Sequence, residues 1–136
     1  MENTVEKQYP EKWQKRFAFY KEFGGPSTQA YHAECKKLSF SQRILIRGNI
    51  IAFFFGPIYF FVIGLWRKNL AILGIAIVAN LIIALIEYMV GATLPEQMNT
   101  PIGFIFSAIW ACTANYAYYL KETQNSKSWN PFEGIF

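Results

Sequence analysis

Three long apolar runs lie between residues 49 and 120, and polar residues bound each of them. The runs cover residues 49–66, 70–91 and 102–120. A helix that crosses a membrane needs about 20 residues at a rise of 1.5 Å each. The second run meets this length easily and the third just meets it. The first is marginal and is interrupted at Gly56-Pro57. The pattern predicts a membrane domain over residues 44–120 with three apolar helices.

The first 43 residues are predicted to form a basic head built from short amphipathic helices. Over residues 11–23, Trp13, Phe17 and Tyr20 recur at the spacing of one helix face, and a Gly-Gly-Pro sequence then ends the helix. A basic helix with an aromatic face can lie in the membrane interface. It can equally pack its rings against the rest of the protein, and the sequence leaves both interpretations open.

Capping residues mark two further helix starts in the head. Ser27 or Thr28 can cap a second helix that runs through Leu38. Ser39 and Gln42 have the spacing of a capping box, in which each residue bonds the other's backbone N–H. This box predicts a third helix that leads into the first apolar run.

The basic residues are distributed asymmetrically around the runs. Of the 13 Lys and Arg, nine precede the first run, two lie between the first and second, none between the second and third, and two follow the third. Lys and Arg of short loops mark the cytoplasmic side. If the first run crosses the membrane, Arg67 and Lys68 lie outside. If it bends at Pro57 and returns, all 13 lie inside. We favour the non-crossing arrangement, which also places the polar tail over residues 121–136 in the cytoplasm.

Polar residues within the apolar runs are candidate functional sites. Glu87 is the only acid in a run, and an ionisable residue in a spanning segment is costly. Asn80, Glu87 and Asn115 could line a polar path for an ion or a proton. We favour another interpretation, in which small residues let the second and third apolar runs pack closely against each other. In a further interpretation, these residues form the interface of a dimer. The predicted packing residues are Ala76, Ala84, Gly103, Ser107 and Ala111.

A basic patch precedes the first apolar run. It consists of Lys36, Lys37, Arg43 and Arg47, with no acid among them. Such a patch attracts anionic lipid headgroups by roughly 1 kcal/mol per residue. We favour the simpler interpretation, in which the patch only orients the chain in the bilayer. The predicted partners are the lipid bilayer with its anionic headgroups, and a membrane protein or further copies of the chain.

Composition favours a membrane protein over a soluble enzyme. The 136 residues are 53% hydrophobic and only 16% charged, whereas soluble domains carry about 25% charged residues. The net charge of +4 is accounted for by the basic flanks of the apolar runs, so we do not expect nucleic-acid binding. The polar start of the chain shows no cleavable signal peptide.

The sequence contains no recognisable catalytic, cofactor-binding or metal-binding constellation. There is no aspartate, and His32 is the only histidine. His32 and Cys35 form an H-x-x-C pair, which is a weak metal signal because no second pair accompanies it. Cys35 and Cys112 fall in different environments, so we predict no disulfide between them. We therefore expect neither catalytic residues nor a cofactor nor a metal.

The stretch AFFFGPIYFFVIGLWRKN, residues 52–69, resembles the signature of the YigF-type family of small bacterial inner-membrane proteins of unknown function. The resemblance extends loosely over residues 40–120 and does not cover the head. It implies a bacterial inner-membrane location and brings no activity or catalytic residues with it. The residues that carry it, whose plainest role is structural, are Gly56, Pro57, Trp66, Arg67 and Lys68.

These patterns together predict an all-α, multi-pass integral membrane protein with both termini in the cytoplasm. A helical head precedes a Pro-bent aromatic segment and a two-helix transmembrane hairpin. The leading functional hypothesis is a non-enzymatic inner-membrane adaptor or accessory subunit. The alternative is a homo-oligomeric channel or transporter that uses Asn80 and Glu87. A lipid-interacting membrane enzyme is a remote third hypothesis, because the sequence offers no nucleophile or base for it.

Overall fold

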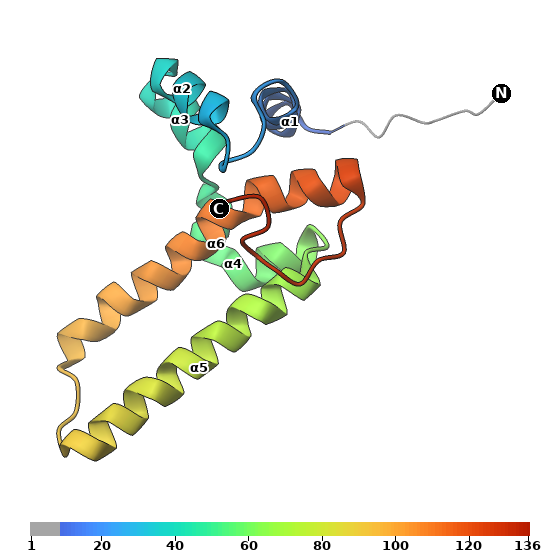
Figure 1. Cartoon of the computed structure of the whole chain (residues 1–136). Helices are drawn as coiled ribbons and strands as arrows, with labels where there is room; N and C mark the ends of the chain where they lie inside the picture. Colours follow the sequence, from blue (N-terminus) through green and yellow to red (C-terminus); the bar gives the residue numbers. More distant parts are fainter. Residues whose placement is uncertain (1–8) are drawn as a thin grey trace.

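The computed structural model describes residues 9–136, in which all regular secondary structure is helical and no strand occurs (Figure 1). The all-α prediction is therefore confirmed for these residues. The predicted head starts at residue 1, and its first eight residues lie outside the described range. The helices are α1 (Glu11–Phe23), α2 (Gln29–Lys37), α3 (Phe40–Arg47), α4 (Ile50–Val62), α5 (Trp66–Val90), the short 3₁₀ helix η1 (Glu96–Met98) and α6 (Asn99–Gln124).

The three head helices begin where their local sequence predicts. Helix α3 does not continue into the apolar run, because the backbone is extended at Gly48 and Asn49. Helix α1 covers the predicted residues and stops at Gly24, whose φ of 85° favours glycine. Thr28, rather than Ser27, caps α2 by accepting a hydrogen bond from the N–H of Tyr31. Ser39 and Gln42 form the predicted capping box at the start of α3.

Helix α4 contains the predicted bend. Asn49 caps its start by accepting a hydrogen bond from the N–H of Ala52 at 3.0 Å. The backbone leaves helical geometry at Phe55, two residues before Pro57, with φ −123° and ψ 24°. A proline ring crowds the preceding turn and offers no N–H, so a bend just before it is expected. After α4 the chain turns through Gly64, whose φ is 80°.

Both ends of α4 lie against the same part of α6. The side chains of Asn49 and Asn115 are joined by a 3.0 Å hydrogen bond, and Lys121 Nζ donates to the carbonyl of Ile63 at 3.0 Å. Residues 115 and 121 of a helix are only about 9 Å apart along its axis. The part of α4 before its bend reaches further along α6, where the rings of Phe53 and Phe104 lie 5.2 Å apart. Helix α4 therefore descends along α6 and returns to its starting level.

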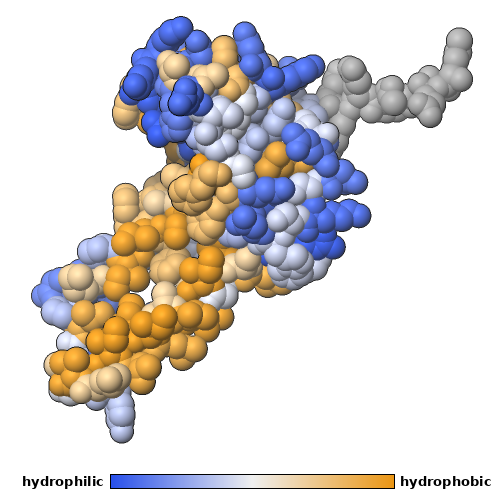
Figure 2. Space-filling model, in the orientation of Figure 1, coloured by the Kyte–Doolittle hydropathy of each residue, from blue (hydrophilic) through white to orange (hydrophobic). Residues whose placement is uncertain are grey.

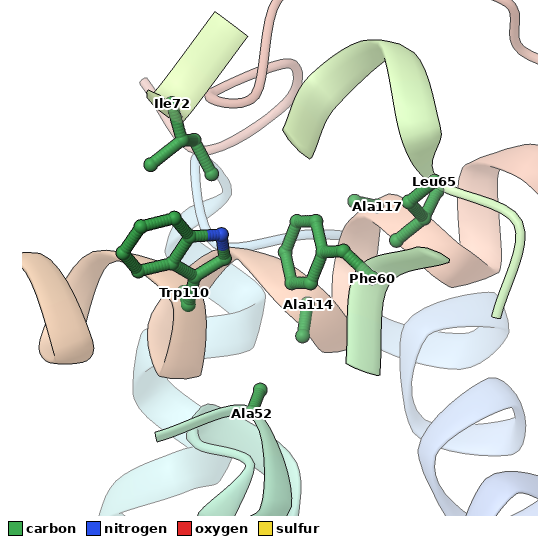
Figure 3. Close-up of a cluster of buried hydrophobic side chains, with 7 residues drawn as sticks. All are labelled: Ala52, Phe60, Leu65, Ile72, Trp110, Ala114 and Ala117. Carbon is green, nitrogen blue, oxygen red and sulfur yellow. The ribbon is translucent and has the colours of Figure 1, made fainter. Parts of the chain in front are cut away.

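Helices α5 and α6 form a long hairpin that extends away from the head (Figure 1). They meet near the head, where Trp110 Nε1 donates to Asn69 Oδ1 at 3.0 Å. Beyond that point they make no extended contact, and the main partner of α6 is α4. A buried apolar cluster fills the junction of α4, α5 and α6 (Figure 3). It consists of Ala52, Phe60, Leu65, Ile72, Trp110, Ala114 and Ala117.

Two helical segments among the described residues are long and apolar enough to cross a membrane. They are Phe40–Val62 and Trp66–Val90. The third run, which we expected to span, is not one of them although α6 has 26 residues. Its second half carries buried polar residues, such as Thr113 and Asn115, that face other parts of the protein. Figure 2 shows a hydrophobic surface over the far end of the hairpin and a hydrophilic one over the head.

Candidate functional site

The aromatic face of α1 packs inside the protein. The rings of Trp13 and Tyr118 lie 4.5 Å apart, and those of Tyr20 and Tyr116 lie 5.2 Å apart. The hydroxyl of Tyr20 donates to the carbonyl of Ile46 at 2.7 Å, and burial raises the Tyr20 pKa well above its usual value. The aromatic face of α1 was predicted either to lie in the membrane interface or to pack against the rest of the protein. In the structure it packs against the rest of the protein.

The Asn115 amide joins three elements at the base of the head. It is buried, and its Nδ2 lies 2.5 Å from the carbonyl oxygen of Gly48 and 3.3 Å from that of Leu45. Its Oδ1 accepts a hydrogen bond from Asn49. The last carbonyls of a helix lack partners within it. Asn115 supplies partners for the end of α3 from a distant part of the chain.

Asn80 and Glu87 lie elsewhere, on the far part of α5. The exposed Asn80 donates to the carbonyl of Ala76 in its own helix at 2.8 Å. Glu87 Oε1 accepts a hydrogen bond from the N–H of Leu94 at 2.6 Å, just beyond the end of α5. Because Asn115 belongs to the half of α6 that serves the head, one chain does not bring the three predicted polar residues together.

The predicted contact between the small-residue stripes of α5 and α6 is absent. The two helices make no extended contact, because α6 packs chiefly against α4. Ala111 is buried, whereas Ala84 and Gly103 are exposed and Ala76 and Ser107 are half-buried. A small residue does allow two helices to approach closely in this protein, but the helices are α4 and α6. Gly56 on α4 lies directly against the ring of Trp110 on α6.

The residues of the family-like stretch organise the bend. A Cβ built on Gly56 would lie 2.6 Å from the Trp110 ring, so only glycine fits there without a shift. Asn69, buried at the start of α5, donates to the carbonyl of Pro57 at 2.8 Å and accepts from Trp110. Sequence reasoning missed Asn69. Its only signal was a polar residue at the edge of an apolar run.

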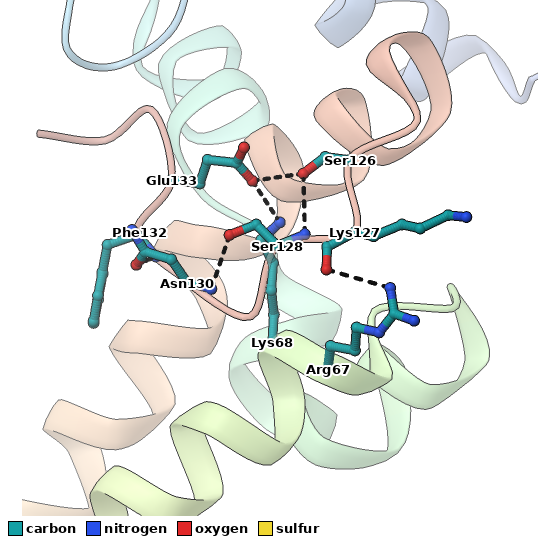
Figure 4. A network of polar contacts seen from close by, with 8 residues as sticks. All are labelled: Arg67, Lys68, Ser126, Lys127, Ser128, Asn130, Phe132 and Glu133. Carbon is teal, nitrogen blue, oxygen red and sulfur yellow. Dashed lines mark hydrogen bonds and ion pairs between the residues drawn. The ribbon is translucent and has the colours of Figure 1, made fainter.

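Lys68 and the C-terminal segment form a second polar network (Figure 4). The Lys68 side chain is 3% exposed and its ammonium lies 3.0 Å from Glu133 Oε2, which also accepts from the Ser126 hydroxyl at 2.7 Å. Burial raises the Glu133 pKa, but the two hydrogen bonds outweigh it and hold that pKa below its ordinary value. This role of Glu133 was also missed, because its partner is distant in sequence.

The basic patch of the head is only partly free to meet lipid. Lys36 and Arg47 are exposed, while Lys37 pairs with Glu34 at 2.9 Å. Arg43 bonds three backbone carbonyls at the end of α2, those of Cys35, Lys36 and Leu38. Arg43 therefore has a structural role beyond any contact with headgroups.

The side chains of the cysteines and the histidine take no part in the hydrogen bonds around Asn115, Asn69 and Lys68. Cys35 is buried in the head and Cys112 is exposed on α6, and both are free, as predicted. Burial raises the pKa of the Cys35 thiol, which keeps it protonated. His32 is exposed on α2. No three His, Cys, Asp or Glu side chains gather at metal-binding distance within residues 9–136.

Comparison with known proteins establishes the family. Residues 2–124 match the family described as "Protein of unknown function (DUF2628)". The chain belongs to the DUF2628 family. It is 35% identical over 124 residues to "Uncharacterized protein YigF" of Escherichia coli (strain K12) and to the proteins of that name from Salmonella typhimurium (strain LT2) and Salmonella typhi. The alignment covers 88% of this chain and 90% of each relative.

The DUF2628 match confirms the resemblance to YigF-type proteins and enlarges it. The resemblance was confined to residues 40–120, whereas the family match includes helices α1 and α2. The head is therefore part of what defines the DUF2628 family. No solved structure matches the chain.

Proposed function

We propose that the protein is a non-enzymatic adaptor or accessory subunit of the bacterial inner membrane. The observation that carries the proposal is the exposed apolar surface of α5. Only 11% of its most apolar 18-residue stretch is buried. Soluble monomers rarely expose contiguous apolar patches above a few hundred Å², so lipid is the natural cover for this helix. Between residues 75 and 86 the large exposed hydrophobic residues of this helix are Ile75, Ile77, Val78, Leu81, Ile82, Leu85 and Ile86.

The proposed topology places the head, the α4–α5 turn and the tail together on the cytoplasmic side. Support comes from α4, whose two ends contact neighbouring turns of α6. In this proposed arrangement α5 and α6 are the helices that cross the membrane, and α4 enters it and returns. The polar network around Asn69 supports the re-entry, since a bend at membrane depth needs internal partners for its freed backbone groups.

Cysteine labelling from outside the cell tests this topology. Lys68 is too buried to report on the turn, so the probe is Trp66→Cys in a chain whose Cys35 and Cys112 are replaced by Ser. We expect no labelling of this variant by a membrane-impermeant maleimide in intact cells. Thr93→Cys, exposed at the tip of the hairpin, is the matched positive control. Labelling of both positions from outside would rule out re-entry.

The adaptor hypothesis predicts a stoichiometric foreign partner. The head presents exposed charged residues on a folded unit, and its buried side chains are engaged in packing and hydrogen bonds. Mild extraction from native membranes followed by native mass spectrometry measures the composition of the complex. A defined foreign protein supports an adaptor. A pure complex of several copies of this chain supports the channel hypothesis instead.

The channel hypothesis is the alternative proposal. It is favoured by the position of Asn80 and Glu87 on the part of α5 that no other helix covers. Several copies would have to bring these residues to a common axis. Glu87→Gln keeps an oxygen acceptor for the N–H of Leu94 while removing the charge. Under this hypothesis it abolishes ion flux in proteoliposomes, and Glu96→Gln, exposed on η1, leaves the flux unchanged.

A further inference from the structure

A small basic pocket lies where the α4–α5 turn meets the end of α6 and the C-terminal segment. Its volume is about 240 Å³. The turn contributes its backbone around Gly64, where the Lys121 ammonium lies so close that a side chain would collide with it. Six of the lining residues offer cationic or hydroxyl groups. They are Arg67, Lys68, Lys121, Ser126, Lys127 and Ser128.

The cations of this pocket outnumber the acids that neutralise them. Lys68 is paired with Glu133, and Lys121 with Glu122 at 3.3 Å. Arg67 and Lys127 pair with no carboxylate among the described residues. The Arg67 guanidinium donates one hydrogen bond to the carbonyl of Lys127 at 3.3 Å and lies 5.0 Å from the Trp66 ring centre. Two positive charges therefore remain to attract an anion.

The backbone and the position of the pocket add to this attraction. The first N–H groups of α5 have no partner within the helix, and Leu65 offers no side chain that could cap them. The Trp66 and Trp129 rings lie 5.3 Å apart at the edge of the pocket and are 45% and 51% exposed. Tryptophans of this kind gather at the level of lipid headgroups. The pocket thus lies at the boundary between the apolar hairpin and the polar head.

We propose that this pocket binds a phosphate group, and that an anionic phospholipid headgroup supplies it. A guanidinium matches two phosphate oxygens at once, and an ammonium acts as a point charge beside it. Arg67 and Lys127 make the direct contacts, Lys68 and Lys121 add to the field, and the ring of Trp66 faces the glycerol region. The lipid source rests on the proposed membrane location, whereas the phosphate site itself does not.

Binding by the full-length chain in neutral detergent micelles tests the proposal. The two ligands are a short-chain phosphatidylglycerol and inorganic phosphate. Isothermal titration calorimetry measures the affinity of the protein for each of them. The pocket variant is Arg67→Gln with Lys127→Gln. Its matched control is Lys12→Gln with Lys21→Gln, which removes two positive charges from exposed positions on α1, outside the basic patch of the head. We expect the pocket variant to bind phosphatidylglycerol at least tenfold more weakly and the control to change less than twofold.

Further outcomes separate the site from its source and from folding defects. The charge-preserving variant Arg67→Lys with Lys127→Arg is expected to retain most of the affinity, which excludes a loss through misfolding. Equal losses in the pocket and control variants, or no loss in the pocket variant, overturn the proposal. If inorganic phosphate binds as tightly as phosphatidylglycerol, the ligand of the site is free phosphate and not a lipid headgroup. Alkaline carbonate extraction of cell membranes tests membrane integration separately, so a failure there leaves the micelle result interpretable.

Discussion

At the residue scale, Asn115 matters because its amide replaces the partners that the end of α3 lacks. It bonds carbonyls of α3 and of the linker to α4, and it also accepts from Asn49, which caps α4. One side chain therefore contacts both the end of α3 and the cap of α4. Asn80, also in an apolar run, bonds only its own helix. Asparagine therefore joins several elements at position 115 and contacts only its own helix at position 80.

Replacing Asn115 by Leu is expected to destabilise the protein markedly. The change removes the hydrogen-bond donor of the Gly48 carbonyl and one of the two partners of the Asn49 amide, which keeps only its 3.3 Å bond to Tyr59. An unsatisfied buried group costs about 1–3 kcal/mol. Equilibrium unfolding in micelles measures the change in the free energy of unfolding. Asn80→Leu is the matched control and is expected to stay within about 0.5 kcal/mol. Equal effects of the two substitutions would contradict the role given to Asn115.

At the scale of elements, the main feature is the seat of bent α4 on α6. The bend brings Gly56 against the Trp110 ring, and Trp110 is held in turn by the Asn69 side chain. Asn69 also bonds the carbonyl of Pro57. The bend, the close approach and the start of α5 therefore stabilise one another. This mutual support explains why an aromatic Gly-Pro stretch can pack so tightly.

Gly56→Ala and Gly74→Ala are expected to change stability in opposite directions. A Cβ at Gly56 collides with a buried ring, and such overpacking costs typically about 1–3 kcal/mol. A Cβ at Gly74 meets nothing within 4 Å, so the better helix propensity of alanine is expected to add about 0.5–1 kcal/mol. Thermal unfolding of both variants measures the difference. A Gly56→Ala variant as stable as the parent would show that the two helices can separate freely.

Elements set by local rules could be predicted from the sequence, and their partners could not. The bounds of α1, the capping box at Ser39 and the bend before Pro57 follow from short-range sterics and hydrogen bonds. Small residues at four-residue spacing show that a helix can be approached closely but not by which helix. The small-residue stripe of α6 that includes Ser107 was therefore predicted to pack against α5, whereas α6 packs chiefly against α4. Asn69 and Glu133 were missed for the same reason, since their partners lie far along the chain.

At the scale of the whole molecule, the C-terminal segment ties the head to the hairpin. The carbonyl of Gly134 accepts a hydrogen bond from the N–H of Ser27 at 3.2 Å, near the start of α2. One residue earlier, Glu133 pairs with Lys68 near the start of α5 (Figure 4). The tail thus contacts both parts of the molecule. It also forms one wall of the basic pocket.

Acidification is expected to weaken this attachment. The pKa of Glu133 is lower in the folded protein than the value near 4.3 of an unfolded chain, so its carboxylate stabilises the fold above about pH 4.3. That contribution is lost as the pH falls through the folded pKa. Melting temperatures between pH 7 and pH 3 are expected to fall less steeply in Glu133→Gln than in the parent. Glu96→Gln, exposed on η1, should retain the parental slope; the same slope in all three proteins would exclude the effect.

The position of α6 at the end of the chain has a consequence for biosynthesis. The Tyr20 ring on α1 packs against Tyr116 and Tyr119, which the ribosome adds about 100 residues later. At a translation rate of about 5–20 residues per second, roughly 5–20 s separate the two events. During this interval the aromatic face of α1 emerges without the surface that finally covers it. The head can therefore reach its final packing only after α6 has been made, although α1 is synthesised well before α6.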